Sequence, residues 1–273
     1  MVRSFKAGAA ALLAAALLLA ASPAPGQPAG AASEAVPAPA GEAARAAFES
    51  LPEDDRSAVQ DALVWTGDYS GAADGTFGRR TFEAIVAYQR RARRPPDGIL
   101  DPAERAALLA AGAAARNAAG FQILSDPATG IRLGIPLRLL PRRSPTGRDG
   151  TRFQSTDGRV TLDLRAQEGD EADLRALYDR NLASPAPGRS VTYRLHRPTL
   201  FVVAGETPGG KFFTRYAAGP DGLRGVSIGY DKALAGEVDR IVVAVSNSFT
   251  PFPGPEGVMA GPTPPPRPAP APP

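Results

Sequence analysis

The chain has 273 residues and a formal net charge of +3 at pH 7, and 22% of its residues are charged. This length allows one large domain or two small domains with real cores. The absence of cysteine and the single histidine, His196, exclude disulfides, a thiol nucleophile, a lipidated cysteine and a zinc site built on several histidines. Acidic residues are interleaved with the arginines, so nucleic acid is disfavoured as a partner.

The first residues have the pattern of a secretory signal peptide. Arg3 and Lys6 precede an uncharged apolar run over residues 7–21, which small residues and prolines follow. The run is short for a membrane-spanning helix, which needs about 20 apolar residues. We therefore expect residues 1–26 to be a cleaved signal and the protein to be exported to the periplasm or cell wall, with no retained membrane span.

Two segments rich in proline and alanine flank the remaining sequence. We expect residues 27–52 to be a linker and residues 253–273 to be a disordered tail. The ending GPTPPPRPAPAPP favours an extended polyproline II conformation, which acts as a semi-rigid spacer. A ligand for a proline-reading partner is the alternative function for this tail.

Residues 53–116 have the pattern of three helices. A proline and three acidic residues mark the start of the first helix, which continues to Gly67. The second helix begins after Gly78, and the third is capped by Asp101 and runs toward Gly112. Apolar positions of the second helix recur at the helical spacing i, i+3, i+4 and i+7, which predicts one buried face. These positions are Thr81, Ala84, Ile85 and Tyr88.

Two Asp-Gly turns separate these helices, at Asp74-Gly75 and at Asp97-Gly98. The order AVQDAL, TGDYSGAADGTFG, RRTFEAIVAYQ, DGILD, AALL resembles the peptidoglycan-binding domain family of small three-helix wall-attachment modules. This resemblance implies that residues 53–116 bind peptidoglycan, through its stem peptide or its glycan. Ile85 is a conservative departure from the family pattern, as is Tyr88, and Arg79 stands where the family often has proline. The matching positions are Gln60, Leu63, Gly67, Tyr69, Asp74, Gly75, Phe77, Gly78, Thr81, Ala84, Gln89, Asp97 and Gly98.

The predicted ligand site lies where the second helix begins. The backbone N–H groups and the positive dipole end of that helix face the turn before it, and this arrangement suits a carboxylate. Arg79 and Arg80 would hold the carboxylate, and Tyr69 would offer a flat contact to sugar or peptide. Asp74 and Thr76 either surround the ligand or only shape the turn. An arginine cluster at the end of the helix is either a solvated helix end or a second carboxylate site, and its members are Arg90, Arg91, Arg93 and Arg94.

Beyond residue 121 the hydrophobic period changes from helical to alternating. Half-buried strands are predicted around residues 160–164, 191–195 and 226–230, and a hairpin turn is predicted at residues 207–210. Two amphipathic helices interrupt the strands, so residues 121–252 are expected to form an α+β domain with an antiparallel sheet covered by helices. The order of elements resembles the PsbP-like fold, whose members mostly serve as binding or assembly modules. This resemblance implies that the domain contacts an envelope protein partner.

We expect no catalytic residue, no metal and no cofactor in this chain. His196 is predicted on the strand face opposite Tyr193, at the surface, which disfavours a Ser-His-Asp triad built on the single histidine. Carboxylates such as those of Asp170 and Glu237 occupy positions that favour solvated acids. Two alternatives stay open: a wall hydrolase or transglycosylase with a carboxylate active site in the second domain, and an assembly scaffold without wall binding. The other carboxylates considered for such an active site are Glu168, Glu206 and Asp239.

The stretch AAGAAARNAAG joins the two predicted modules. Its small residues offer few specific contacts, so we expect the modules to be separable near residues 116–121.

Overall fold

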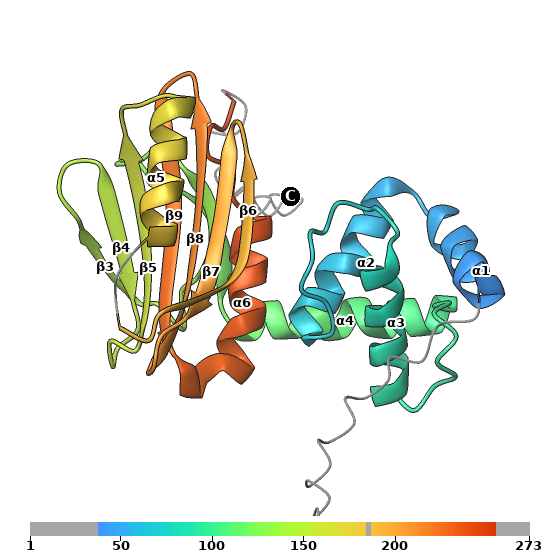
Figure 1. The fold of residues 1–273 in the computed structure, drawn as a ribbon. Coiled ribbons are helices and arrows are strands. Elements are labelled where there is room, and N and C mark those ends of the chain that lie inside the picture. Colours follow the sequence, from blue (N-terminus) through green and yellow to red (C-terminus); the bar gives the residue numbers. More distant parts are fainter. Residues whose placement is uncertain (1–37, 184–186, 255–273) are drawn as a thin grey trace, which may run out of the picture. The chain divides into compact units, whose positions relative to one another are not determined.

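The computed structural model describes residues 38–183 and 187–254, which form a helical region followed by a sheet domain (Figure 1). This arrangement confirms the predicted multidomain α then α+β fold. The predicted signal peptide and nearly all of the predicted tail lie outside the described residues. Within the described ranges, no helix is long and apolar enough to cross a membrane.

The helical region contains a helix that the sequence did not predict. The helices of this region are α1 (Ala38–Glu49), α2 (Glu53–Thr66), α3 (Arg79–Arg91) and α4 (Pro102–Ala118). Part of the segment predicted as a linker is therefore α1, which corrects that prediction. Ala44 and Phe48 lie four residues apart and are buried on one side of α1, and the Phe48 ring lies 5.4 Å from the ring of Phe77. The alanine-rich composition hid this short apolar face.

Helix α4 is longer than predicted. The sequence places the end of this helix near Gly112, but the helix continues to Ala118. Gly112 does not end the helix but packs closely against α2. A Cβ atom at this position would lie 2.7 Å from Cα of Ala62. The missing side chain therefore allows α4 to cross α2 closely.

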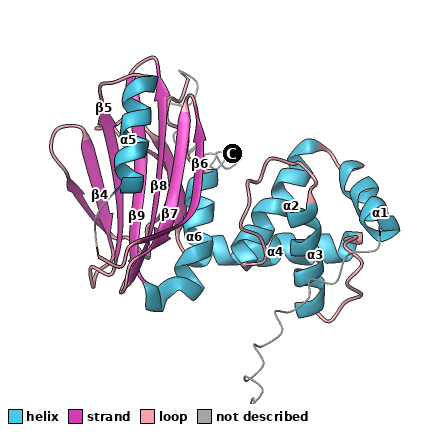
Figure 2. Cartoon of the chain, viewed as in Figure 1, coloured by secondary structure: helices cyan, strands magenta, loops and turns pink. Residues whose placement is uncertain are grey.

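The sheet domain is antiparallel throughout (Figure 2). Its seven-stranded sheet has the order β3-β4-β5-β9-β8-β7-β6, and β1 pairs with β2 in a separate two-stranded sheet. The hairpin predicted at residues 207–210 is confirmed as the β7–β8 turn, in which Thr207 N donates to Gly210 O. The strands are β1 (Phe121–Ser125), β2 (Arg132–Pro136), β3 (Arg142–Pro145), β4 (Gly150–Gln154), β5 (Val160–Gln167), β6 (Ser190–Arg197), β7 (Leu200–Glu206), β8 (Gly210–Gly219) and β9 (Gly222–Asp231).

Each face of the seven-stranded sheet is packed by one helix. On one face, Leu174 and Tyr178 of α5 (Glu171–Ala183) pack with Phe201, Val203 and Tyr216. On the other face, α6 (Ala235–Asn247), which follows the short helix η1 (Lys232–Leu234), packs on the β8 and β9 part of the sheet. The alternation of strand residues explains the two cores, because neighbouring residues point to opposite faces.

The helical region and the sheet domain share one hydrophobic cluster. Val64 and Trp65 of α2 are fully buried in the same cluster as Ile131 and Leu133, and the Trp65 ring meets the Phe121 ring edge-on at 4.9 Å. The junction is therefore held more tightly than its alanine-rich sequence predicts. Separation of the modules near residues 116–121 stays a prediction, and it would expose this shared apolar surface.

Candidate functional site

The first Asp-Gly turn is held by a buried glutamine of α2. Gly75 has a φ of 72°, and its N–H donates to Oε1 of Gln60 at 2.7 Å. Gln60 is fully buried, and its Nε2 donates to Thr76 O at 2.9 Å and to Thr81 Oγ1 at 3.2 Å. A single side chain thus fixes the turn against the start of α3, because it satisfies backbone groups that would otherwise be buried without partners.

Helix α3 begins without a side-chain cap. Its N-cap residue, Gly78, is extended, with φ −144° and ψ 179°, and it has no side chain that could accept from the first helical N–H groups. An uncapped first turn retains the partial positive charge of the helix dipole. This geometry is the one expected for a site that receives a carboxylate.

The residues predicted to bind ligand fall into two groups. Asp74 and Thr76 are exposed, and Oδ1 of Asp74 accepts from Thr76 N at 2.9 Å, so Asp74 shapes the turn. Arg79 is exposed and its Nε donates to Glu83 at 2.7 Å. Tyr69 and Arg80 line a groove between α3 and the sheet domain. The prediction of these five residues as ligand contacts stays a prediction.

Tyr69 also has a structural role that the sequence did not indicate. It is half-buried, it packs against the core of the helical region and against the shared cluster, and its hydroxyl donates to Ala72 O at 3.1 Å. Replacement of Tyr69 by alanine should therefore lower stability as well as any binding. Tyr69→Phe is the variant that tests the hydroxyl alone.

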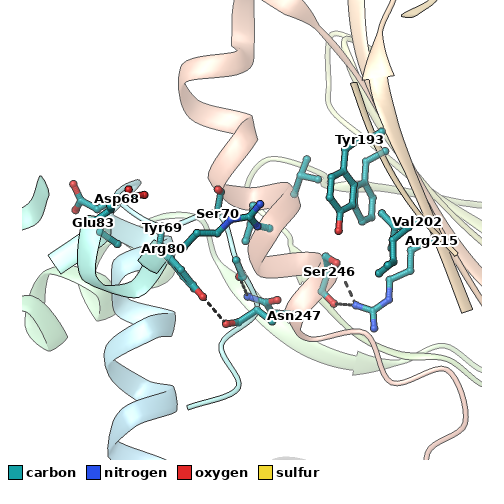
Figure 3. Close-up of a pocket in the computed structure, with 18 of the residues that line it drawn as sticks. Asp68, Tyr69, Ser70, Arg80, Glu83, Tyr193, Val202, Arg215, Ser246 and Asn247 are labelled. Carbon is teal, nitrogen blue, oxygen red and sulfur yellow. Dashed lines mark hydrogen bonds between the residues drawn. The ribbon is translucent and has the colours of Figure 1, made fainter. Parts of the chain in front are cut away.

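The groove has a volume of about 880 Å³ and is formed by both regions of the chain. Figure 3 shows Tyr193, Val202 and Arg215 on the sheet side and Asp68, Arg80 and Glu83 on the opposite side, with Ser246 and Asn247 of α6 between them. The sheet side presents mainly apolar residues of β6, β7 and β8, and α6 adds two valines. These apolar residues are Leu195, Leu200, Val202, Ala204, Phe213, Val242 and Val243.

Arg215 is the groove residue whose chemistry the sequence did not indicate. Its Nη1 donates to Ser246 O at 2.6 Å and to Ser246 Oγ at 3.2 Å, and its guanidinium lies 5.2 Å from the Phe249 ring centre. Burial lowers the pKa of Arg215 from the usual arginine value. An arginine between Phe213 and Ala217, on the alternating inner positions of an apolar strand, is the signal that could have identified it.

The arginine cluster at the end of α3 is partly engaged within the molecule. Arg91 pairs with Asp68 and lies over the Tyr88 ring, with 5.6 Å to the ring centre. Arg94 pairs with Asp101 and Glu104. These pairs favour the structural interpretation for two of the four arginines.

The polar residues of the sheet domain that were considered for catalysis make structural contacts. His196 is half-buried, not at the surface as predicted, and its ring lies 4.8 Å from the Tyr178 ring on the α5 face. Asp170 accepts from backbone N–H groups at the start of α5, and Asp239 accepts from Lys211 and Tyr230. Among the described residues, no group of three or more histidine, aspartate or glutamate side chains is gathered so that it could hold a metal ion.

Part of the helical region matches a known family. Residues 52–108 match the sequence model of the family described as "Putative peptidoglycan binding domain". This match covers α2, α3 and the first part of α4, and it agrees with the resemblance noted from the two Asp-Gly turns. A search of curated proteins found no match to the chain.

The matched segment accounts for only part of the groove. It ends at residue 108, so Tyr193, Arg215 and Asn247 lie outside it. Within the domain, Gln60 and Gln89 are buried residues that hold the two turns. Both glutamines stabilise the fold, and because they are buried, a ligand would contact other side chains.

Proposed function

We propose that this chain is an exported, non-catalytic protein that attaches to peptidoglycan through its helical region and presents the sheet domain to an envelope partner. The family match over residues 52–108 carries the proposal. The uncapped start of α3 next to the first Asp-Gly turn supports a carboxylate-bearing ligand there.

The proposal of a non-catalytic role rests on the state of the carboxylates in the sheet domain. A general acid of a glycosidase requires a raised pKa so that it keeps its proton near neutral pH. The pKa of Glu206 is lowered instead, chiefly by its hydrogen bond with Lys232. The carboxylate of Asp239 accepts hydrogen bonds from the Lys211 ammonium group and from the Tyr230 hydroxyl.

Sedimentation with insoluble peptidoglycan tests the attachment. The full-length mature protein should appear in the pellet, and Phe77→Ala, which removes a buried ring of the helical core, should lose binding together with folding. Arg79→Ala should weaken sedimentation with little change in the thermal midpoint, because Arg79 is exposed. Wild-type protein that stays in the supernatant would refute the wall attachment.

A zymogram with peptidoglycan embedded in the gel tests the absence of catalysis. We expect no clearing at the position of the refolded protein, and a lysozyme lane serves as the positive control. A clearing band that persists in the purified protein would establish the hydrolase alternative.

Export is tested by the intact mass of the protein recovered from the envelope. We expect a mature chain that begins between Ser22 and Ser33, as the signal-peptide pattern predicts. Recovery of a chain that still begins at Met1 would contradict cleavage.

A further inference from the structure

The charges of the groove are unbalanced in a way that favours an anionic ligand. Its two carboxylates are each paired with an arginine that is not part of the groove lining: Asp68 with Arg91, and Glu83 with Arg79. Its two arginines, Arg80 and Arg215, have no carboxylate partner among the residues that the structure describes. The groove therefore carries positive charge that a bound anion would balance.

Arg215 offers unused hydrogen-bond donors at this place. A guanidinium has five N–H donors, and Nη1 accounts for the bonds to Ser246. Its Nε is buried and has no hydrogen-bond partner within the described chain. A carboxylate is the group that matches such a fork of donors, and a partly desolvated arginine gains most from one.

A β-bulge in β6 directs an aromatic side chain to the same groove. The register of β6 against β7 shifts between Val191 and Tyr193, so Val191 packs with the α5 cluster and Tyr193 points to the opposite face. Tyr193 is 47% exposed, so its ring is accessible to a ligand that lies over the apolar strand face. Bulges of this kind commonly reorient a side chain beside a binding site.

We propose that this groove binds the stem peptide of peptidoglycan, with Arg215 and Arg80 holding its carboxylates and Tyr193 covering its apolar side. The inference rests on the proposed attachment to peptidoglycan and adds the sheet domain as the second side of the binding site. Stem peptides combine free carboxylates with small apolar side chains, which matches a positively charged groove over an apolar strand surface. A volume of about 880 Å³ accommodates a few residues of extended peptide.

Calorimetric titration of the full mature protein with a soluble disaccharide-tetrapeptide tests the proposal. Tyr193→Ala and Arg215→Gln should each raise Kd about tenfold, because each removes a main contact to the peptide. The matched control is Arg194→Gln, which removes the same charge from the neighbouring position of β6, on the other strand face, and should leave Kd within about twofold. The same disaccharide without its peptide should bind at least tenfold more weakly than the tetrapeptide form.

Stability and wall attachment are measured in parallel so that the outcomes stay distinct. If Arg215→Gln lowers the thermal midpoint, Tyr193→Ala is the variant that tests binding in the groove, because Tyr193 is exposed. If wild type sediments with peptidoglycan while both variants bind the tetrapeptide as wild type does, wall attachment stands and the groove is refuted as its site. Equal binding of the disaccharide without peptide would also refute it. If wild type neither sediments nor binds the tetrapeptide, the attachment and the groove proposal both fail.

Discussion

The two Asp-Gly turns of the helical region are built alike. In each, the N–H of a glycine with positive φ donates to a buried glutamine: Gly75 to Gln60 at 2.7 Å, and Gly98 to Gln89 at 2.9 Å. In each, the aspartate before that glycine accepts from the N–H two residues further on, at 2.9 Å. The shared residues are therefore the scaffold of the turn.

The difference between the turns lies in the helix that follows each one. Helix α4 has a capping box, in which Asp101 accepts from Glu104 N at 2.7 Å and Glu104 accepts from Asp101 N at 3.0 Å. Helix α3 begins at Gly78 with no side-chain cap. The start of α4 is therefore capped by its own side chains, whereas the start of α3 keeps an uncapped positive end.

Removal of either glutamine should have the largest effect on the stability of the two Asp-Gly turns. Gln60→Ala and Gln89→Ala each leave a buried glycine N–H and further polar groups without partners, and each should cost about 3 kcal/mol of unfolding free energy. Urea unfolding of the full chain measures both. A loss of less than about 1 kcal/mol in either variant would contradict the role of that glutamine.

Replacement of each turn glycine by alanine should destabilise the two turns by different amounts. A Cβ at Gly98 would lie 2.4 Å from Cε2 of the buried Phe82, whereas at Gly75 the nearest atom, Oγ of Ser57, is 3.2 Å away. Both positions have positive φ, which alone costs about 1 kcal/mol, and the clash should raise the cost of Gly98→Ala to about 3 kcal/mol. Equal thermal shifts in the two variants would contradict this difference.

Gly78→Asp should close the open helix start. The backbone of Gly78 is extended and a Cβ there meets no atom within 4 Å, so the new side chain can cap α3 without strain. We expect stability to rise by a few tenths of a kcal/mol and sedimentation with peptidoglycan to weaken, because the added carboxylate occupies the place of the ligand. Gly78→Ala is the matched control without a cap, and weakened sedimentation in it alone would contradict the explanation.

Lowering the pH should weaken the cap of α4, and this is the smallest of the expected effects. The backbone N–H of Glu104 is the main cause that lowers the pKa of Asp101. This contribution is complete above the unfolded value of about 3.9 and is lost as the pH falls through the lowered folded value. Between pH 6 and pH 3, the thermal midpoint should therefore fall slightly more in wild type than in Asp101→Asn, which does not titrate. An identical fall would show that the cap is insensitive to protonation.

The sequence predicted those parts of the fold that local patterns determine. The Asp-Gly turns, the capped start at Asp101 and the alternating strand around Val226 depend on neighbouring residues, and the structure confirms them. The sequence does not indicate helix α1, because its few apolar residues lie among alanines, and Gly112, which packs against Ala62, has the pattern of a helix end.

The groove could not be predicted, because it joins segments that are distant in sequence. The turn alone predicts Tyr69 and Arg80 as ligand contacts, whereas Arg215 of β8 and Asn247 of α6 line the same groove only in the folded chain. The bulge in β6 also lay beyond prediction, since simple alternation assigns Val191 and Tyr193 to one face.

The burial of Trp65 among side chains of the sheet domain has a mechanical consequence. A wall anchor on a slack tether lets its cargo rotate freely, but here any pull on α2 acts at once on packed side chains around Trp65 and Phe121. In the proposed attachment to peptidoglycan, this packing would fix the orientation of the sheet domain relative to the glycan strands.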